Sequence, residues 1–277
     1  MIGYNRLGSN GFLGNQMFQY AGIRGIAASM NYKWVIPSPD SYYDANYGLF
    51  DCFKMESVSA DNFGLINSKS HATGLCHFDK ELFNNCPDNV SLNDYFQSEK
   101  YFKNVEHIIR KDFTFKDEIL KTCKPFIESL HKPVFLHVRR GDYLNVPDFH
   151  PVCSIDYYRK ALSYFDDDCE IVICSNDIEW CKNQELFSSD RFLISEGNDR
   201  YEHKSMVVGG WDNVLIPYYD LCLMSLCSGA IIANSSMSWW GAWLQNNVEK
   251  VIAPKEWFGS AANNDTKDLY SDNWVVI

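Results

Sequence analysis

The chain has 277 residues, enough for about two domains, and its 46% hydrophobic and 22% charged residues are ordinary for a globular protein in water. The formal net charge of −11 argues against nucleic acid or an anionic membrane as partner, so any anion site must be made positive locally. No segment has the pattern of a signal peptide or a membrane-spanning helix, and we expect a cytoplasmic protein without membrane insertion.

The N-terminal part is predicted to begin with a strand over residues 2–7, a helix over 15–30 and a strand over 33–36. Three glycines precede the helix: Gly8, Gly11 and Gly14. Free N–H groups at such a helix start can bind an anion, which the helix dipole also favours. A plain tight turn with Asn15 as helix N-cap explains the same residues equally well, and the glycine spacing fits neither a dinucleotide fingerprint nor a P-loop.

The C-terminal part alternates between apolar strands and helical patterns. The expected strands are 134–138, 170–174, 191–195, 230–234 and 250–253. The expected helices are 154–165, 177–185, 217–228 and 236–246, preceded by one near 116–130. This alternation predicts an α/β fold with a doubly wound parallel sheet, whose ligand crevice lies outside the carboxyl ends of the strands. We place a boundary near residues 131–133, which gives domains over 1–132 and 133–277.

Two adjacent arginines follow the first of these strands, in the run His137-Val138-Arg139-Arg140-Gly141-Asp142. Guanidinium groups beside a glycine suit an anionic ligand such as a diphosphate. Because successive side chains of a strand point to opposite faces, both arginines cannot reach one ligand if the strand continues through them. We therefore expect one arginine to bind phosphate and the other to pair with Asp142; an ordinary ion pair on a surface loop is the alternative.

Polar residues also follow the other strands. They are Ser175, Asn176, Asp177, Glu196, Asn234, Ser235 and Ser236. The serines, with Ser238, lie at a strand-to-helix turn where hydroxyl and N–H groups could bind phosphate, cap the helix, or do both. Asn176 and Asp177 could contact guanine or ribose, or equally cap the helix that begins there. The block Trp239, Trp240 and Trp243 is expected to be helix-face core.

Taken together, these segments resemble the inverting alpha-1,2-fucosyltransferase family. The matching stretches are residues 12–21, with Phe12 where the family usually has glycine, and 137–143, 153–158, 175–181, 233–243 and 251–258. The resemblance spans nearly the whole chain and is weakest over residues 40–115.

The resemblance implies two Rossmann-like domains facing a cleft, the GT-B type, with GDP-fucose on the C-terminal domain and the acceptor on the N-terminal one. It implies transfer of L-fucose from GDP-fucose to the 2-hydroxyl of a terminal beta-galactoside. It also implies that Arg140 contacts the diphosphate, that Arg139 is structural and paired with Asp142, and that His137 lies beside the site. Gly14, Asn15 and Gln16 would contact the donor from the N-terminal domain.

Inverting transfer needs an acceptor for the proton of the incoming hydroxyl. Asp142 ranks first because it belongs to the motif, although pairing with an arginine would weaken it as a base. His150 ranks second, and an exposed loop histidine is its simpler interpretation. His137 is expected to be a strand-interior histidine with a satisfied hydrogen bond.

No metal and no cofactor are expected, GDP-fucose being a substrate. The acidic run Asp166-Asp167-Asp168 precedes a strand, at the end away from the crevice, and we interpret it as a solvated loop. Arginines and backbone amides can take the place of a metal.

The ten cysteines are scattered, without tandem zinc-type pairs, and are expected to be reduced.

Two other functions are alternatives to the transferase. A catalytically silent nucleotide-sugar binding protein is disfavoured by the intact 139–142 and 14–16 motifs. An oxidoreductase of the Rossmann type would need a different glycine spacing. The polar, aromatic segment 196–211 is a candidate acceptor or lid loop.

Overall fold

The structure is a computed structural model that describes residues 1–39, 47–67, 69–74, 76–195, 206–208, 211–214, 217–262 and 264–277. The chain divides into two compact units. Unit 1 comprises residues 1–116, 206–214 and 264–271, and unit 2 comprises residues 117–205, 215–263 and 272–277. The chain thus enters unit 1 again twice after first leaving it, and helix α5 (Asp117–Glu128) falls in unit 2 although the boundary expected from the sequence lay after it.

Unit 1 is built on a parallel four-stranded sheet with the strand order β2-β1-β4-β3. Its strands are β1 (Ile2–Gly3), β2 (Trp34–Val35), β3 (Ser70–His71) and β4 (Val90–Leu92). Its helices are α1 (Leu13–Ser29), α2 (Leu49–Cys52), η2 (Ala60–Asn62), α3 (Lys80–Asn85), η3 (Glu99–Tyr101), η4 (Lys103–Val105) and α4 (Glu106–Asp112). A separate antiparallel pair is formed by β8 (Met206–Val208) and β9 (Trp211–Val214).

Helix α1 is the centre of unit 1 and is buried from Leu13 to Ala27 except at Asn15. A Cβ at Gly25 would overlap the carbonyl oxygen of Tyr101, so the glycine lets η3 approach the helix backbone closely. The buried Arg24 reaches Asp112 at the end of α4, with 2.8 Å between Nη1 and Oδ2. The helix is thereby fixed to the rest of the unit on more than one side.

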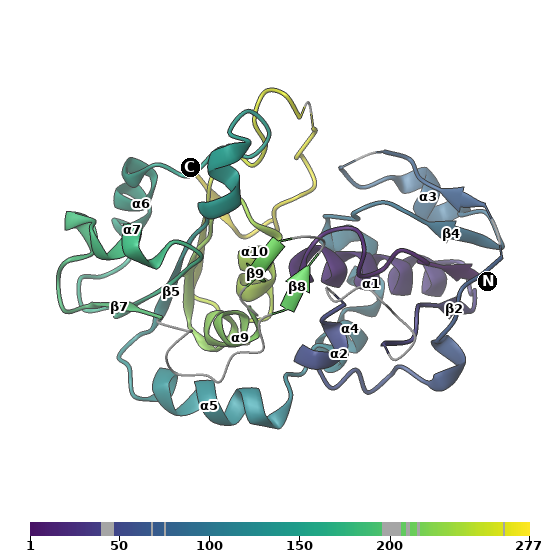
Figure 1. The fold of residues 1–277 in the computed structure, drawn as a ribbon, viewed down its shortest axis with the longest axis horizontal. Helices are drawn as coiled ribbons and strands as arrows, with labels where there is room; N and C mark the ends of the chain where they lie inside the picture. The colour runs from purple at the N-terminus through teal and green to yellow at the C-terminus, as the bar shows by residue number, and fades with distance from the viewer. Residues whose placement is uncertain are drawn as a thin grey trace. The chain divides into compact units, whose positions relative to one another are not determined.

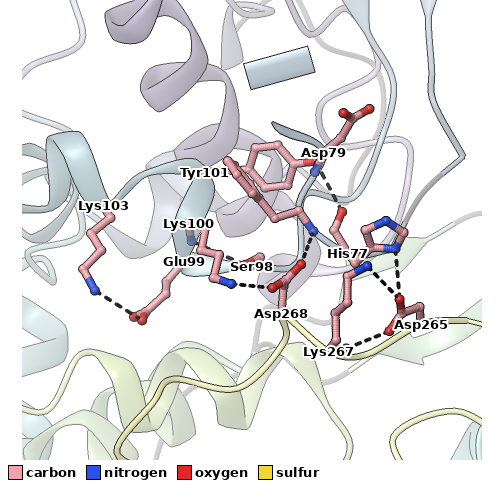
Figure 2. Close-up of polar contacts among 11 residues, drawn as sticks. His77, Asp79, Ser98, Glu99, Lys100, Tyr101, Lys103, Asp265, Lys267 and Asp268 are labelled. Atoms are coloured by element: carbon pink, nitrogen blue, oxygen red, sulfur yellow. Dashed lines mark hydrogen bonds and ion pairs between the residues drawn. The ribbon is translucent and has the colours of Figure 1, made fainter. Parts of the chain in front are cut away.

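Residues 264–271 belong to unit 1 although they come late in the chain. Asp268 accepts a hydrogen bond from the Phe78 amide at 3.2 Å and forms an ion pair with Lys100, as Figure 2 shows. Asp265 lies 3.6 Å from Nδ1 of His77. This segment is therefore fastened to the region just before α3 and to η3 by carboxylates.

Unit 2 contains a parallel six-stranded sheet with the order β12-β11-β10-β5-β6-β7. Figure 1 labels two of its strands, β5 and β7, together with the helices α6 and α7. Its strands are β5 (Val134–Val138), β6 (Ile171–Ser175), β7 (Phe192–Ile194), β10 (Gly229–Ile231), β11 (Lys250–Ala253) and β12 (Val275–Val276). Its helices, besides α5, are η5 (Gly141–Asn145), α6 (Ile155–Leu162), α7 (Ile178–Lys182), η6 (Glu185–Phe187), α9 (Tyr218–Leu226) and α10 (Ser236–Trp243).

Helices cover both faces of this sheet. Val134, Leu136 and Val138 of β5 pack in one apolar cluster with residues of α6 and α7, among them Tyr158 and Cys181. On the opposite face α9 contacts β5 and β6 and lies against α5 and α10. Because both faces are covered, β5 and β6 are buried throughout, as the continuous apolar runs in the sequence predicted.

The doubly wound parallel sheet predicted from the sequence is confirmed. The N-terminal strand is shorter than the predicted 2–7 because Asn5 turns its side chain to the backbone of Ile66, and Gly8 takes φ +97° in the turn that follows. Asn15 is not the N-cap of α1: the helix begins at Leu13 after Phe12. Among the described residues no helix is long and apolar enough to cross a membrane.

Candidate active site

The strand order of unit 2 has a switch point between β5 and β10. From β5 the chain proceeds outward through β6 and β7, and β10, β11 and β12 fill the other side. Ligands of doubly wound sheets bind at such a point, outside the carboxyl ends of the strands. Three of the predicted groups lie there: residues 139–142 after β5, 175–177 after β6 and 234–236 after β10.

Arg140 is held by the turn between β6 and α7. Its Nε donates to Oδ2 of Asp177 at 3.0 Å, and its guanidinium lies over the Trp180 ring, 4.3 Å from the centroid. Its backbone amide donates to Oδ1 of Asn176 at 2.9 Å. Among the described residues, no group accepts a hydrogen bond from its Nη atoms, so the outer edge of the guanidinium keeps its donors.

Arg139 takes a different direction. Its Nη2 lies 2.8 Å from the Asp142 carboxylate, and its guanidinium stacks on Tyr143 at 5.0 Å from the ring centroid. The pairing of Arg139 with Asp142 predicted from the sequence is confirmed. The Nε of Arg139 is buried and has no partner within the described part of the chain.

Asn176 and Gly141 fix the backbone of residues 140–142. Besides accepting from Arg140, Asn176 places Nδ2 3.5 Å from Oδ1 of Asp142. Gly141 has φ +40°, and a Cβ there would overlap the Asn176 amide. A side chain at position 141 would therefore be strained by its backbone and would displace Asn176.

Asp177 has two roles within the protein. Its Oδ1 accepts from the Trp180 amide at 3.2 Å and caps α7, which confirms the capping interpretation, while its Oδ2 holds Arg140. Ser175 in turn accepts from the Asp177 amide at 2.9 Å through its Oγ. These bonds order the β6–α7 turn.

His137 is buried in β5, and burial together with nearby Arg139 lowers its pKa to about 3, so the ring is neutral near pH 7. The prediction of a satisfied hydrogen bond was wrong: Nδ1 is buried without a partner in the described structure. It is the backbone carbonyl of His137 that receives a bond, from the Tyr158 hydroxyl at 3.2 Å.

His150 is not the exposed loop histidine that the sequence suggested. Its ring stacks on Tyr143, with centroids 4.7 Å apart and planes 18° apart, and its other neighbour is Phe258 at 6.0 Å. Burial lowers the pKa of His150, which favours the neutral ring that can accept a proton. Its Nδ1 has no partner among the described groups.

Asn234 is almost fully buried and uses its side chain inside the protein. Its Nδ2 donates to the carbonyl oxygens of Pro151 at 2.8 Å and Trp257 at 3.1 Å. The backbone carbonyl oxygen of Asn234 accepts from the Tyr143 hydroxyl at 3.0 Å, which ties the arginine loop to the end of β10. Asn234 therefore holds the segments around residues 143, 151 and 257 together through hydrogen bonds.

The serines at the start of α10 differ from one another. Ser235 occupies the N-cap position without a capping hydrogen bond from its side chain, so the capping alternative does not hold for this residue. Ser236 is the first residue of the helix and is half-buried. Ser238 is buried and donates to the carbonyl of Ala233 at 3.1 Å. The tryptophans of α10 are core residues, as predicted.

The glycine-rich segment lies in unit 1, where amide side chains organise it. Gln16 is fully buried; its Nε2 donates to the Gly11 carbonyl at 3.3 Å and its Oε1 accepts from the Gly48 amide at 3.1 Å. Asn15 is half-buried and accepts from Gln97 at 2.9 Å. Gly14 is buried within the first turn of α1.

The acidic run 166–168 lies before β6, at the opposite end of the sheet from the arginines. Lys132 reaches Asp168 at 2.9 Å and Asp166 at 3.6 Å, and Arg191 reaches Asp167 at 3.5 Å. Within the described residues, no group of three or more His, Cys, Asp or Glu side chains could hold a metal ion. The ten cysteines are free thiols.

Sequence reasoning missed three residues of this region. Arg140 lies over the ring of Trp180, and Arg139 lies over the ring of Tyr143. The signal available in the sequence was the position of each ring, three residues after Asp177 and three residues after Arg140. Asp220, in the first turn of α9, accepts from Ser195 at 2.8 Å at the end of β7, and burial raises its pKa to about 6. Glu196 and most of the candidate acceptor loop 196–211 lie outside the described residues.

Comparison with known proteins defines the class. The model of the family "Glycosyl transferase family 11" matches residues 1–277. The chain therefore belongs to glycosyltransferase family 11 and is a glycosyltransferase.

Its relatives include two proteins from Escherichia coli. The O-antigen biosynthesis glycosyltransferase WbnK is 27% identical over 97% of this chain and 98% of its own, and an alpha-1,2-colitosyltransferase is 30% identical over 96% of both. A galactoside alpha-(1,2)-fucosyltransferase 2 from Pongo pygmaeus is 25% identical over 84% of this chain and 67% of its own.

Solved structures share the fold. The alpha-1,6-fucosyltransferase NodZ soaked with GDP-fucose superimposes with a TM-score of 0.55 at 13% identity, covering 92% of this chain and 94% of that one. POFUT1 in complex with GDP gives 0.53 at 11% identity, covering 91% and 97%. At these identities the likeness concerns the fold alone.

Proposed function

We propose that this family 11 enzyme transfers L-fucose from GDP-fucose to the 2-hydroxyl of a terminal beta-galactoside, with inversion at the sugar and without a metal ion. The observation that carries the proposal is Arg140 at the switch point of the sheet, which Asp177 and Trp180 hold in place while no described residue accepts from its Nη donors. A braced guanidinium fork suits a diphosphate leaving group.

In the proposed step the acceptor hydroxyl oxygen bonds to C1 of fucose while the bond from C1 to the diphosphate oxygen breaks. The electron pair leaves with GDP, whose added negative charge Arg140 and the N–H groups at the start of α10 would stabilise. The hydroxyl proton passes to a base, with Asp142 the first candidate and His150 the second. Donor and acceptor would lie on units 2 and 1, respectively, as in a GT-B arrangement.

The linkage and the sugar are supported by the relatives. The names of both a bacterial and a primate relative specify an alpha-1,2 linkage. The name of the primate relative also specifies fucose and a galactoside. A second donor sugar must be considered, because the relative at 30% identity is a colitosyltransferase. Colitose is fucose without its 3-hydroxyl, so one site could distinguish the two only through contacts at that position.

The test is incubation with GDP-fucose and a panel of beta-galactosides, with the linkage of the product read by NMR and the GDP-linked 3-deoxy sugar supplied in parallel. We expect a fucosyl alpha-1,2-galactoside, formed equally well in excess chelator. Faster transfer of the 3-deoxy sugar would assign the enzyme to the second donor. Loss of turnover in chelator with recovery on adding magnesium or manganese would contradict the metal-free mechanism.

A further inference from the structure

The contacts of Arg140 restrain its guanidinium at two places: at Nε and on one face of its plane. Nε is bonded to Asp177 at 3.0 Å, and Trp180 lies under the guanidinium plane at 4.3 Å. The backbone of Arg140 is fixed as well, through Asn176 at 2.9 Å. Only 18% of the Arg140 side chain and 27% of the Asp177 side chain is exposed, so the pair is partly shielded from water.

We infer that Asp177 and Trp180 are positioning residues, which hold the Arg140 guanidinium in the orientation that binds the diphosphate. The inference rests on the proposed function, since it assigns the diphosphate to Arg140. An arginine on a loop loses side-chain freedom when it binds a ligand, and restraining it in advance removes that cost from binding. Asp177 is suited to this task because capping α7 through Oδ1 fixes its own carboxylate.

The same ion pair could act in the opposite direction. If Asp177 only neutralised Arg140, it would weaken the attraction between the arginine and an anionic ligand. Removing its charge would then strengthen GDP binding, whereas positioning requires that binding become weaker. The two roles thus differ in the sign of a measurable effect.

The experiment compares the dissociation constants of GDP and guanosine, by calorimetry and by competition, in the full-length protein. The variants are Asp177→Asn, which keeps an oxygen for capping, Trp180→Leu, and Trp180→Phe, which restores an aromatic face. Glu179→Gln is the matched control, since it removes one charge from the same helix and the Glu179 carboxylate, among the described residues, pairs with exposed Lys182 alone, at 3.3 Å. Thermal midpoints verify folding.

We expect Asp177→Asn to weaken GDP binding about 5- to 20-fold, the range typical of coupled residues in one ion-pair network, and guanosine binding less than about twofold. Trp180→Leu should act in the same way, Trp180→Phe should recover most of the loss, and Glu179→Gln should change neither constant. In an Arg140→Ala background, Asp177→Asn should have almost no further effect.

Each other outcome has a definite meaning. Tighter GDP binding by Asp177→Asn, or equal losses for GDP and guanosine, would overturn the positioning role. A full additional loss in the Arg140→Ala background would do the same. If the unmodified protein binds no GDP, the proposed function itself fails, which is a different result from GDP binding that is insensitive to Asp177.

Discussion

The segment before α1 and the loop after β5 both combine glycines with polar side chains, yet they use those side chains differently. In the first turns of α1, Gln16 and Gln19 turn inward and bond to the backbone of residues 10–11 before the helix, and both are fully buried. After β5, Arg139 and Arg140 bond to carboxylates through part of each guanidinium. The first region thus uses its polar groups to build a loop, and the second keeps charged donors available for a ligand.

This difference teaches that a motif does not by itself distinguish the residues that shape a site from those that bind in it. Amides have both donors and acceptors and can satisfy a folded backbone completely. A guanidinium has five donors and no acceptor, so one carboxylate leaves part of it unused. Substitution of Arg140 should therefore affect turnover, and substitutions in the glycine segment should affect stability.

The largest effect is expected at the proton acceptor. If Asp142 is the base, Asp142→Asn should lower kcat by about 10²- to 10⁴-fold while GDP-fucose affinity and the thermal midpoint stay close to those of the unmodified enzyme. If Asp142 only orients Arg139, at 2.8 Å, then stability and activity should fall together. His150→Ala, measured in parallel, should be nearly silent in the first case. Full activity in both variants would exclude both residues.

The next largest effect should separate the two arginines. Arg140→Ala should lower kcat about 10²-fold, as expected for loss of a preorganised charge donor, and Arg140→Lys should restore little because an ammonium lacks the planar fork. Arg139→Ala should instead mainly lower the thermal midpoint, since its partners Asp142 and Tyr143 lie within the same loop. Near-normal turnover by a folded Arg140→Ala variant would show that Arg140 does not bind the diphosphate.

Much of unit 2 was predictable because its strands are buried on both faces and read as unbroken apolar runs. β5 was placed at its observed bounds, 134–138, and each helix that follows a predicted strand was found near its expected range. The short strands β3 and β4 of unit 1 were not predicted. Two or three residues carry no periodic signal, and β4 is specified by its pairing with β1.

The site was predictable in its location and less so in its contacts. Strand ends marked residues 139–142 and 175–177, and the pairing of Arg139 with Asp142 followed from their proximity in sequence. The bond between Arg140 and Asp177 joins residues 37 positions apart, and only the folded sheet brings them together. The burial of Asn234 and His150 likewise depends on Trp257 and Phe258, far along the chain.

In the glycine segment, Gln16→Ala should reduce the free energy of unfolding by about 2–4 kcal/mol, because it removes a fully buried side chain and leaves the buried Gly48 amide without its acceptor. The kcat of the folded fraction should change much less than in the arginine variants. Denaturant unfolding measures the first quantity. Asn85→Ala, at an exposed amide of α3, serves as control and should shift stability by less than about 0.5 kcal/mol. A large fall in kcat at unchanged stability would place Gln16 in the binding site.

The smallest effect concerns His137, which adjoins the arginines but is predicted to act on stability alone. Its folded pKa of about 3 lies below the unfolded value, so below about pH 6.5 the unfolded chain takes up a proton that the folded protein does not. Its contribution to stability is therefore complete above that pH and is lost progressively as the pH falls toward 3.

Between pH 8 and pH 5 the loss should be about 2 kcal/mol. His137→Phe, which removes the titrating group and its unpaired Nδ1, should flatten the stability profile by this amount when denaturant unfolding is measured across the range. An unchanged slope in the variant would mean that other groups cause the acid sensitivity.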